Sequence, residues 1–359
     1  MSIKYNGGYL PTVGADGSTL VANSSASTGV SWAGPQFVAG RNKILNGDMV
    51  IAQRGISKTV TAGATSDYVL DRWNYINDGT PTYTVSQQAF TPGAAPVAGY
   101  EGKYFLRWNQ TSAGSGASYG VIRQRIEDVQ TFAGQTVTLS FWAKAASAFT
   151  LGAPTLNQNF GSGGSSQVTT IFGGGASLTT SWQRFTLTVA LPPISGKTVG
   201  TGSYLELGYY MPINTTFTFD IWGVQLEAGS VATPFTTATG TLQGELNACQ
   251  RYYWRSTAAG SAYTRFGNCT NAASTTSVPI FFTNPVPMRT VPTALEYGGS
   301  LQAYDQVGGT NISSLGLGTS SPYITVVNAT VASGLTQYRG YFLLANNDTT
   351  AYVGATAEL

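Results

Sequence analysis

The 359-residue sequence contains no histidine and few charged residues. Without histidine, catalytic triads that use its imidazole, His-ligated zinc sites and the commonest general base are excluded. Charged residues make up 9% of the chain, whereas about a quarter is typical of a globular protein. The net charge is +2 and no run of Lys or Arg occurs. The basic stripe that nucleic-acid binding requires is therefore missing.

Cysteine and long apolar runs are also scarce. The cysteines are Cys249 and Cys269, which excludes a disulfide scaffold and favours two buried free thiols, although a single bridge stays open. No stretch of about 18 apolar residues occurs, so we expect no insertion into a membrane. The N-terminus, MSIKYNGG, lacks the apolar core of a signal peptide. We therefore expect synthesis in a cytoplasm.

The chain is rich in glycine and threonine where it is poor in charged residues. The sequence has 44 glycines and 48 threonines, and 42% of its residues are hydrophobic. Threonine favours pleated, half-buried surfaces and glycine favours turns and bulges, so this composition is typical of an all-β protein with a neutral, hydroxyl-rich exterior. Because little charge repulsion keeps such chains apart, we expect oligomers. A chain of this length is expected to form two or three domains.

Residues 41–238 contain strands in which apolar and polar residues alternate. The alternating stretches are Tyr104–Trp108, Val137–Trp142, Phe185–Leu191 and Phe217–Trp222. Glycine- and proline-rich loops separate them, for example residues 91–99 and 161–166. Alternation with a period of two places one face of each strand in a core. Many short strands divided by turns predict a β-sandwich, and the size fits a jelly roll of two antiparallel sheets.

A short helical bridge is predicted between two β-domains. Within residues 239–256, the stretch Thr241–Trp254 carries an apolar stripe at helical spacing. The stripe consists of Leu242, Leu246, Cys249 and Tyr253. A helix this short needs a partner, and we expect its own copies around a trimer axis to supply one.

Residues 257–359 return to β signals. The candidate strands are Val278–Phe282, Tyr323–Val327 and Gly340–Leu344. Glycine- and asparagine-rich turns separate these strands, so a second, smaller β-sandwich is the simplest prediction.

Residues 1–40 form a separate segment by composition. Asp16-Gly17-Ser18 signals a turn and Thr19–Ala22 a short strand, while residues 24–29 are small and polar. The segment is too short to bury a core of its own. Two interpretations stay open, an attachment arm that orders on a partner and an intertwined trimer stem, and both need another chain.

Six short sequence motifs, called phrases below, are spaced across residues 42–229. They are Asn42–Asp48 (NKILNGD), Gln53–Gly55 (QRG), Asp71–Trp73 (DRW), Gln124–Glu127 (QRIE), Leu139–Lys144 (LSFWAK) and Val224–Gly229 (VQLEAG). In this order they resemble the carbohydrate-binding-module-like jelly roll of bacteriophage tail fibres and related virion adhesins. Glu245–Tyr253 resembles the helix-like bridge that follows such domains, and Pro285–Thr293 resembles the opening of the small β-domain at the far end of the fibre.

The resemblance implies an adhesive or structural virion protein and not an enzyme. It implies a homotrimeric tail-fibre or receptor-binding subunit, located in the virion tail and assembled in the host cytoplasm. Residues 1–40 would attach to a tail or baseplate protein, and the distal β-domain would contact a host-surface glycan or lipopolysaccharide.

Two alternative functions remain open. One is a structural virion component, such as a head fibre, decoration or baseplate protein, that uses the same module as a scaffold. The other is an enzyme that acts on surface polysaccharide. No motif of paired carboxylates and no β-helix repeat supports the enzyme.

Aromatic residues are the candidate glycan contacts. The chain has 7 tryptophans and 20 tyrosines, and such rings combine a large apolar face with a polar tip, which suits the C–H faces and hydroxyls of sugars. Four tryptophans in phrases or strands are interpreted as core residues: Trp73, Trp108, Trp142 and Trp222. Four tyrosines near turns of the last domain are the candidate receptor contacts: Tyr263, Tyr297, Tyr304 and Tyr338. Loops at the end of a sandwich commonly carry specificity.

A structural calcium ion is the one cofactor that the resemblance suggests. Jelly-roll modules of this kind often hold Ca²⁺ between an N-terminal acidic residue and one on a late strand, and Asn46, Asp48 and Asp220 occupy the matching positions. These side chains supply only part of the roughly six to eight oxygen ligands that calcium needs. Met49-Val50-Ile51 also replaces the glutamate that the family places after this phrase. The alternative is that Asp48 and Asp220 accept hydrogen bonds in turns.

Three arginines within the phrases are predicted to form partly buried ion pairs. They are Arg54, Arg72 and Arg125, beside Asp71, Glu127 or Asp128. In a chain with so few charges we expect these pairs to fix the register of the sandwich, so that loss of one partner costs about 3–5 kcal/mol. Direct contact with a ligand is the alternative role.

Overall fold

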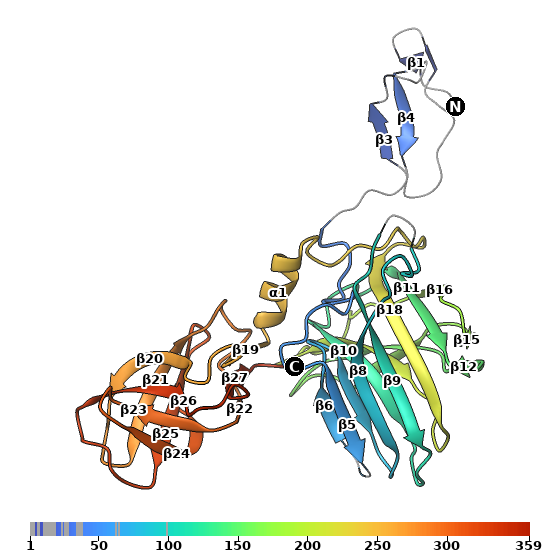
Figure 1. Ribbon diagram of the computed structural model, residues 1–359. Coiled ribbons are helices and arrows are strands. Elements are labelled where there is room, and N and C mark those ends of the chain that lie inside the picture. The colour runs from blue at the N-terminus through green and yellow to red at the C-terminus, as the bar shows by residue number, and fades with distance from the viewer. Residues whose placement is uncertain are drawn as a thin grey trace. The chain divides into compact units, whose positions relative to one another are not determined.

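The computed structural model describes residues 39–61, 63, 65–97 and 100–359, together with the short pieces 4–5, 8–9, 19–22, 24 and 29–33. Within them the regular structure is β apart from one short helix, which confirms the all-β class (Figure 1). The chain divides into two compact units, Met1–Glu245 and Leu246–Leu359. Since this division falls inside the helix, the expected domain limits at residues 40, 238 and 256 remain predictions.

The first unit holds two six-stranded antiparallel sheets. The first sheet has the order β14-β13-β17-β10-β7-β6 and the second has the order β16-β11-β18-β9-β8-β5. The strands of the first sheet are β6 (Thr65–Tyr68), β7 (Asn74–Asn77), β10 (Gly120–Glu127), β13 (Thr155–Asn159), β14 (Val168–Ile171) and β17 (Tyr204–Tyr210). Those of the second are β5 (Ser57–Thr61), β8 (Thr82–Ala89), β9 (Tyr104–Ser112), β11 (Thr136–Ala145), β16 (Gln183–Ala190) and β18 (Phe217–Ala228).

Successive strands change sheet repeatedly, as β9, β10 and β11 do, which is the connectivity of a sandwich of jelly-roll type. A small extra sheet pairs β12 (Phe149–Leu151) with β15 (Ala176–Leu178). In Figure 1 the second sheet is seen with β8, β9, β18 and β11 side by side. The predicted sandwich is therefore present.

The two sheets enclose one apolar core, and the predicted alternation along the strands is confirmed. In β18 the side chains of Phe217, Phe219 and Ile221 face this core. Beyond Gly223 the phase changes, because Val224 and Leu226 face the core instead. Gly223 has φ of 64°, and a Cβ at this position would lie 2.7 Å from the Trp142 ring. Glycine thus permits a local irregularity that a two-residue pattern does not predict.

The four tryptophans interpreted as core residues are all buried. Trp73 and Trp108 belong to the main core, and Trp142 and Trp222 form a smaller aromatic cluster with Phe90, Phe105 and Phe235. None of the four is more than 7% exposed. Their role in packing is therefore confirmed.

Two short antiparallel strand pairs occur in the described pieces of the N-terminal segment. β1 (Lys4–Tyr5) pairs with β2 (Gly8–Tyr9), and β3 (Thr19–Ala22) pairs with β4 (Val30–Ala33). The predicted strand at residues 19–22 is thus present. The predicted turn at Asp16-Gly17-Ser18 lies outside the described residues.

The second unit contains a closed barrel instead of the expected second sandwich. The barrel has the order β20-β21-β25-β24-β23-β26, and a three-stranded sheet, β19-β27-β22, completes the unit. The barrel strands are β20 (Arg265–Asn271), β21 (Ser277–Thr283), β23 (Leu301–Tyr304), β24 (Gly309–Leu317), β25 (Ile324–Val331) and β26 (Gly340–Ala345). The sheet consists of β19 (Tyr253–Thr257), β22 (Ala294–Gly298) and β27 (Tyr352–Thr356).

Closure of the barrel depends on β26, which pairs with both β20 and β23. Irregular registers in β20 and β24 bend these strands, and such bends allow a sheet to curl until its edges meet.

The helix α1 spans Leu242–Gln250 and is shorter than predicted. Thr241 Oγ1 accepts a hydrogen bond from Gly244 N at 3.1 Å, which is the geometry of a helix N-cap. The helix stops because Tyr253 and the next four residues pair with β27 as strand β19, and aromatic residues favour such positions. Cys249 and Tyr253 are 0% exposed in the single chain, so the expectation that sister copies cover this stripe is wrong for these two residues.

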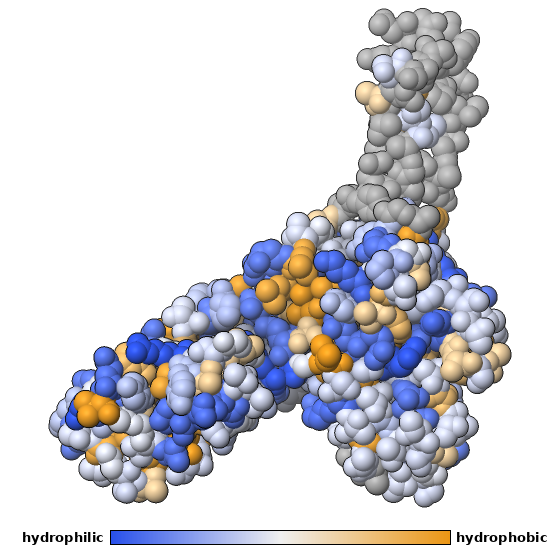
Figure 2. All heavy atoms as spheres, viewed as in Figure 1, coloured by the Kyte–Doolittle hydropathy of each residue, from blue (hydrophilic) through white to orange (hydrophobic). Residues whose placement is uncertain are grey.

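Both cysteines are free thiols, with Cys249 buried and Cys269 exposed. The expectation of two buried thiols is therefore wrong for Cys269, because it lies on an exposed stretch of β20. No helix within the described residues is long and apolar enough to cross a membrane. Figure 2 shows a surface that is mostly pale, the colour of residues with intermediate hydropathy, with smaller blue and orange areas.

Candidate functional site

The side chain of Asn46, in the Asn-Gly-Asp phrase, connects its own loop to the loops that contain Ile51 and Asp71. Its Nδ2 donates to the carbonyl oxygens of Ile51 at 2.8 Å and Asp71 at 3.0 Å, and its Oδ1 accepts from Ile51 N at 2.8 Å. The Trp73 indole donates to the Asn46 carbonyl at 3.0 Å. These contacts satisfy backbone groups that no strand pairs. The Asn46 side chain is thus fully used within the protein and is 0% exposed.

Gly47 and Asn42 attach the same phrase to β18. The Gly47 carbonyl accepts from Val224 N at 3.0 Å, and a Cβ on Gly47 would lie 2.3 Å from the Val224 oxygen. Asn42 Nδ2 donates to the carbonyls of Val224 and Thr236, both at 3.0 Å. Only glycine therefore fits at position 47.

Other phrases make comparable internal contacts. Gln124 accepts from Leu45 N at 2.8 Å and donates to Leu45 O at 2.9 Å. Glu227 accepts from Thr233 N at 2.9 Å and from Thr233 Oγ1 at 2.8 Å. The residues that carry the family resemblance thus hold the sandwich together.

The three predicted calcium ligands have different partners. Asp220 accepts from Arg107 Nε at 2.7 Å and Nη2 at 2.8 Å, and Lys144 Nζ lies at 3.8 Å. Asn46 binds backbone groups, as described above, and Asp48 lines a separate pocket. The structure therefore does not bring the three side chains together as one ligand set. Among the described residues, no group of three or more Asp, Glu, Cys or His residues is placed to hold a metal ion.

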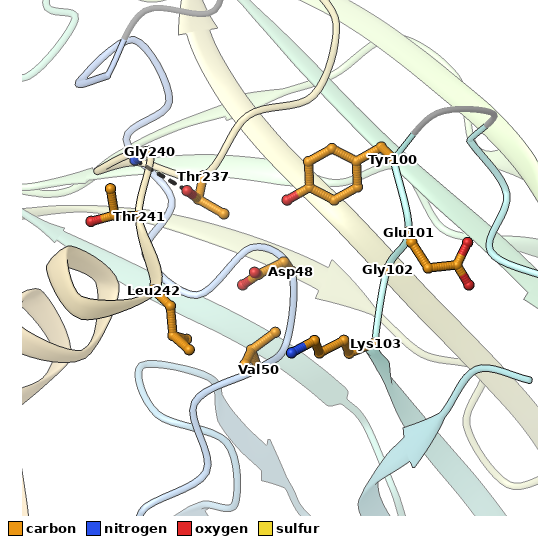
Figure 3. Close-up of a pocket in the computed structure, with 10 residues that line it drawn as sticks. All are labelled: Asp48, Val50, Tyr100, Glu101, Gly102, Lys103, Thr237, Gly240, Thr241 and Leu242. Carbon is orange, nitrogen blue, oxygen red and sulfur yellow. Dashed lines mark hydrogen bonds between the residues drawn. The ribbon is translucent and has the colours of Figure 1, made fainter. Parts of the chain in front are cut away.

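The pocket beside Asp48 has a volume of about 350 Å³. Ten residues line it (Figure 3): Asp48, Val50, Tyr100, Glu101, Gly102, Lys103, Thr237, Gly240, Thr241 and Leu242. Burial, together with the nearby negative charge of Glu245, raises the pKa of Asp48 to about 6. The Oδ1 atom of Asp48 is buried and has no hydrogen-bond partner within the protein.

Glu245, the acidic neighbour of Asp48, is not available to a ligand. Its carboxylate accepts from Asn46 N at 2.8 Å, Thr239 N at 2.7 Å and Thr239 Oγ1 at 2.9 Å. The residue is 1% exposed. Since glycoside hydrolysis needs two carboxyl groups that both face the substrate, the Asp48–Glu245 pair does not have that arrangement.

The first sheet has a polar and aromatic face directed away from the core. Ile122, Leu156, Leu205 and Leu207 face the core, so their neighbours along each strand point to the opposite side. We call this side the outer face; its larger side chains are Tyr68, Asn74, Arg123, Arg125, Asn157, Tyr204, Glu206 and Tyr210.

A charged network centred on Glu206 occupies the middle of the outer face. Arg125 Nε lies 2.9 Å from Glu206 Oε2, and Arg123 Nη1 lies 3.3 Å from the same oxygen. Asn157 Nδ2 donates to Glu206 Oε1 at 3.3 Å, and Arg123 Nε donates to Asn74 Oδ1 at 2.8 Å. The network fixes the polar side chains of four adjacent strands.

Arg125 has a partner that its sequence neighbours did not indicate. It pairs with Glu206, because the antiparallel register places the two directly opposite. Arg72 Nη2 donates to the Arg125 carbonyl at 2.5 Å. Burial raises the pKa of Asp71, and the positive charge of Arg54 opposes that rise.

Two oxygens on the outer face lack partners. Asn157 Oδ1 and Thr155 Oγ1 are buried without a hydrogen bond inside the protein. Thr155 is paired with Gly208, and the missing side chain of this glycine leaves room that Thr155 and the Tyr210 ring fill. Tyr210 is 38% exposed, and Arg125 lies 4.5 Å from the centre of the Tyr204 ring. The face thus offers aromatic rings beside unsatisfied acceptors.

The four predicted receptor tyrosines lie on different elements of the second unit. Tyr338, Tyr263 and Tyr297 are 75%, 56% and 41% exposed, and Tyr304 is half-buried at the end of β23. An ion pair of 2.9 Å between Asp305 and Arg339 joins the segments of Tyr304 and Tyr338. Their role in receptor binding remains a prediction.

The second unit also has a hollow of about 420 Å³, at a different place from these tyrosines. It is lined by Trp254, Arg255, Ser256, Gly267, Asn268, Phe281, Phe282, Thr283 and Pro285. None of the four tyrosines lines this hollow.

Comparisons with known proteins identify no family. No protein-family model matches the sequence, and no curated protein matches it. The solved structures that resemble part of the chain include the enzymatically active domain of tailspike protein 4 of bacteriophage CBA120, with 16% identity and a TM-score of 0.32. The match covers 53% of this chain and 22% of that protein, so the chain spans about a fifth of the tailspike structure.

Two carbohydrate-binding modules resemble a similar share of the chain. One is a CBM4 module, with 16% identity and a TM-score of 0.29 over 51% of this chain and 98% of the module. The other is the CBM22-1 xylan-binding domain of Xyn10C from Paenibacillus barcinonensis, with 15% identity and a TM-score of 0.31 over 55% of this chain and 100% of the domain.

Proposed function

We propose that this chain is a non-catalytic adhesin subunit of a bacteriophage tail fibre, which binds a glycan of the host surface as a homotrimer. It is assembled in the host cytoplasm and joins the virion tail through residues 1–40. Three sites per fibre raise avidity by roughly 10² to 10⁴ even when each site is weak.

The observation that carries this proposal is the outer face of the first sheet. It places the rings of Tyr204 and Tyr210 beside the unsatisfied oxygens of Thr155 and Asn157. Rings stack on the C–H faces of sugars, and a ligand is one explanation for buried polar atoms that lack a partner inside the protein. The order of the six phrases, which resembles tail-fibre jelly rolls, adds the virion context.

A structural virion component is the second candidate. The Glu206 network favours it, because Arg123, Arg125 and Asn157 already satisfy the carboxylate from within the protein. In that case the sandwich is a spacer and binds no glycan.

Glycan binding by the full-length chain tests the proposal. The protein is applied to an array of bacterial lipopolysaccharides and capsular polysaccharides, and to whole cells of a susceptible host. We expect selective binding that falls at least tenfold, or about 1.4 kcal/mol, in Tyr204→Ala and Thr155→Val. Absence of binding to any glycan or cell, together with display on the capsid, would establish the structural alternative.

Two controls locate the site. Tyr323→Ala removes a tyrosine that is 64% exposed and is expected to leave binding unchanged. Tyr338→Ala tests the tyrosines of the second unit, and loss of binding in this variant alone would move the site there. Release of reducing sugar from a bound polysaccharide would contradict the non-catalytic assignment.

A further inference from the structure

Three polar atoms without a hydrogen bond to the described residues face the Asp48 pocket, although the Asp48 carboxyl also accepts from the backbone of Val50. Asp48 Oδ1 is buried and accepts no hydrogen bond. Within the described residues, neither the Tyr100 hydroxyl nor the Lys103 ammonium group makes a hydrogen bond or ion pair. Figure 3 shows these three groups directed toward the same space. They come from segments that are more than 50 residues apart in the sequence, so the fold and not local sequence brings them together.

We propose that this pocket binds one neutral sugar residue, or a similar polyol, at a site separate from the outer face of the first sheet. One hydroxyl of the ligand donates to the Asp48 carboxylate, and its neighbour accepts from Lys103. Charge-assisted hydrogen bonds of this kind are among the stronger polar contacts in proteins. The inference rests on the proposed glycan-binding function and adds a second place for it.

The charges that line the pocket favour a neutral ligand. Lys103 opposes the entry of a metal cation or a protonated amine, while Asp48 opposes an anion. A hydroxyl-bearing ligand suits both signs, because each hydroxyl both donates and accepts. Val50 and Leu242 add apolar side chains, which can contact the C–H groups of a sugar ring. A volume of about 350 Å³ lies within the range of small-molecule sites.

The wall that carries Tyr100 and Lys103 is positioned by aromatic packing. The Tyr100 ring lies 5.7 Å from the Trp222 ring and 5.4 Å from the Phe235 ring, measured between centroids. Gly102 lies against the Trp222 indole, where a Cβ would come within 2.9 Å of the ring. The wall therefore exists before a ligand arrives, which lowers the entropic cost of binding.

Saturation-transfer difference NMR on the full-length protein tests this inference. The ligands tested are the methyl glycosides of glucose, galactose, mannose and N-acetylglucosamine. Calcium chloride and glycine are tested as a metal cation and a zwitterion, and their binding is measured by calorimetry. We expect at least one glycoside to bind the wild-type protein. Its affinity should fall at least tenfold in Asp48→Asn and in Lys103→Met, since each variant removes one charged partner.

Matched variants separate the pocket from the rest of the surface. Lys43→Met and Asp128→Asn change exposed residues outside the pocket and should leave glycoside binding unchanged. Because Lys103 is exposed, its variant should keep the near-ultraviolet circular dichroism of the wild type even if Asp48→Asn does not. Glycoside binding that survives in both pocket variants would overturn the inference. So would binding of calcium or glycine, but of no glycoside, in a manner that depends on Asp48.

The test also distinguishes this inference from the proposed function. If polysaccharides bind on the array and no methyl glycoside binds the wild type, the pocket assignment fails and the adhesin proposal stands. If a glycoside binds in an Asp48-dependent manner and no host glycan binds, the adhesin proposal fails and the pocket remains a sugar site. Tyr204→Ala should weaken array binding without changing glycoside binding in the pocket.

Discussion

Individual buried polar side chains connect the loops of the first unit to one another and to β18. Asn46 and Gln124 bind backbone groups of loops, and Asn42 binds the Val224 carbonyl of β18 and the Thr236 carbonyl. A buried backbone group without a partner costs about 1–3 kcal/mol, so these side chains are as important to the fold as apolar ones. The phrases that resemble tail-fibre jelly rolls therefore reflect packing requirements.

Replacing Gly47 with alanine tests the tightest of these contacts. The new Cβ would lie 2.3 Å from the Val224 oxygen, so the backbone must shift and the hydrogen bond between Val224 N and Gly47 O is strained. We expect a loss of about 2–4 kcal/mol in the free energy of unfolding, measured by urea denaturation. Gly173→Ala is the matched control, since nothing lies within 4 Å of its added Cβ. Equal stability of the two variants would contradict the close packing at Gly47.

The pKa of Asp48 predicts a pH-dependent effect of Asp48→Asn. Folding raises this pKa from 3.8 to about 6, so the folded state holds the proton more tightly than the unfolded state does. The corresponding stability is present below pH 3.8 and is lost as the pH rises through about 6. Near neutral pH the ionised carboxylate therefore opposes folding, by up to about 3 kcal/mol.

Asparagine removes this opposition. We expect Asp48→Asn to raise the free energy of unfolding by about 1–3 kcal/mol at about pH 7.5 and to change it little at about pH 4. Urea titrations of both proteins at the two pH values measure the difference. An effect of the same size at both values would show that burial does not perturb Asp48.

At the scale of elements, charged pairs fix how neighbouring strands lie in the first sheet. Arg125 on β10 faces Glu206 on β17, and Asn157 on β13 contacts the same carboxylate. The pair is partly buried, with side chains 23% and 11% exposed. Removal of one partner leaves a charge that water reaches poorly.

A double-mutant cycle on this pair measures its contribution. We expect Arg125→Met or Glu206→Gln alone to cost about 2–4 kcal/mol, because the first removes one of the two arginines that pair with Glu206 and the second removes the carboxylate that both arginines share. The double variant should cost less than the sum of the two, which gives a coupling energy of about 1–3 kcal/mol. Additive losses would mean that the two residues act independently.

The elements also show which parts of the fold the sequence can predict. Strands such as β9, β11 and β16 were predictable because their side chains alternate between core and surface. The change of phase at Gly223 and the closure of the barrel through β26 were not, since both depend on contacts between residues far apart in the chain. Cys269 was misjudged for a related reason, because nothing local marks its side of β20 as exposed.

The candidate sites were predictable only in part. Asp48 stood out because it belongs to a phrase, although its true neighbours, Tyr100 and Lys103, are 52 and 55 positions away. The outer face left one signal, the alternation of Tyr204, Glu206 and Tyr210 with leucines in β17. This alternation alone does not show that Arg125 and Asn157 lie beside Glu206. Their position depends on the register between the strands, which only the folded sheet defines.

For the molecule as a whole, the low charge and the proposed adhesive role both favour association. The proposed trimer should have three times the 37.6 kDa mass of one chain. Mass photometry of the full-length protein measures this directly, and we expect the trimer to persist at nanomolar concentration. A stable monomer under these conditions would contradict trimerisation, although it would leave the outer face as a candidate glycan site.

The most direct test of the account is an experimental structure of the full-length protein with the glycan that the array identifies. We predict sugar density on the outer face of the first sheet, in contact with the Tyr204 ring and with Asn157 and Thr155. Density that contacts only the tyrosines of the second unit, or an outer face that stays free of sugar at saturating ligand, would contradict it.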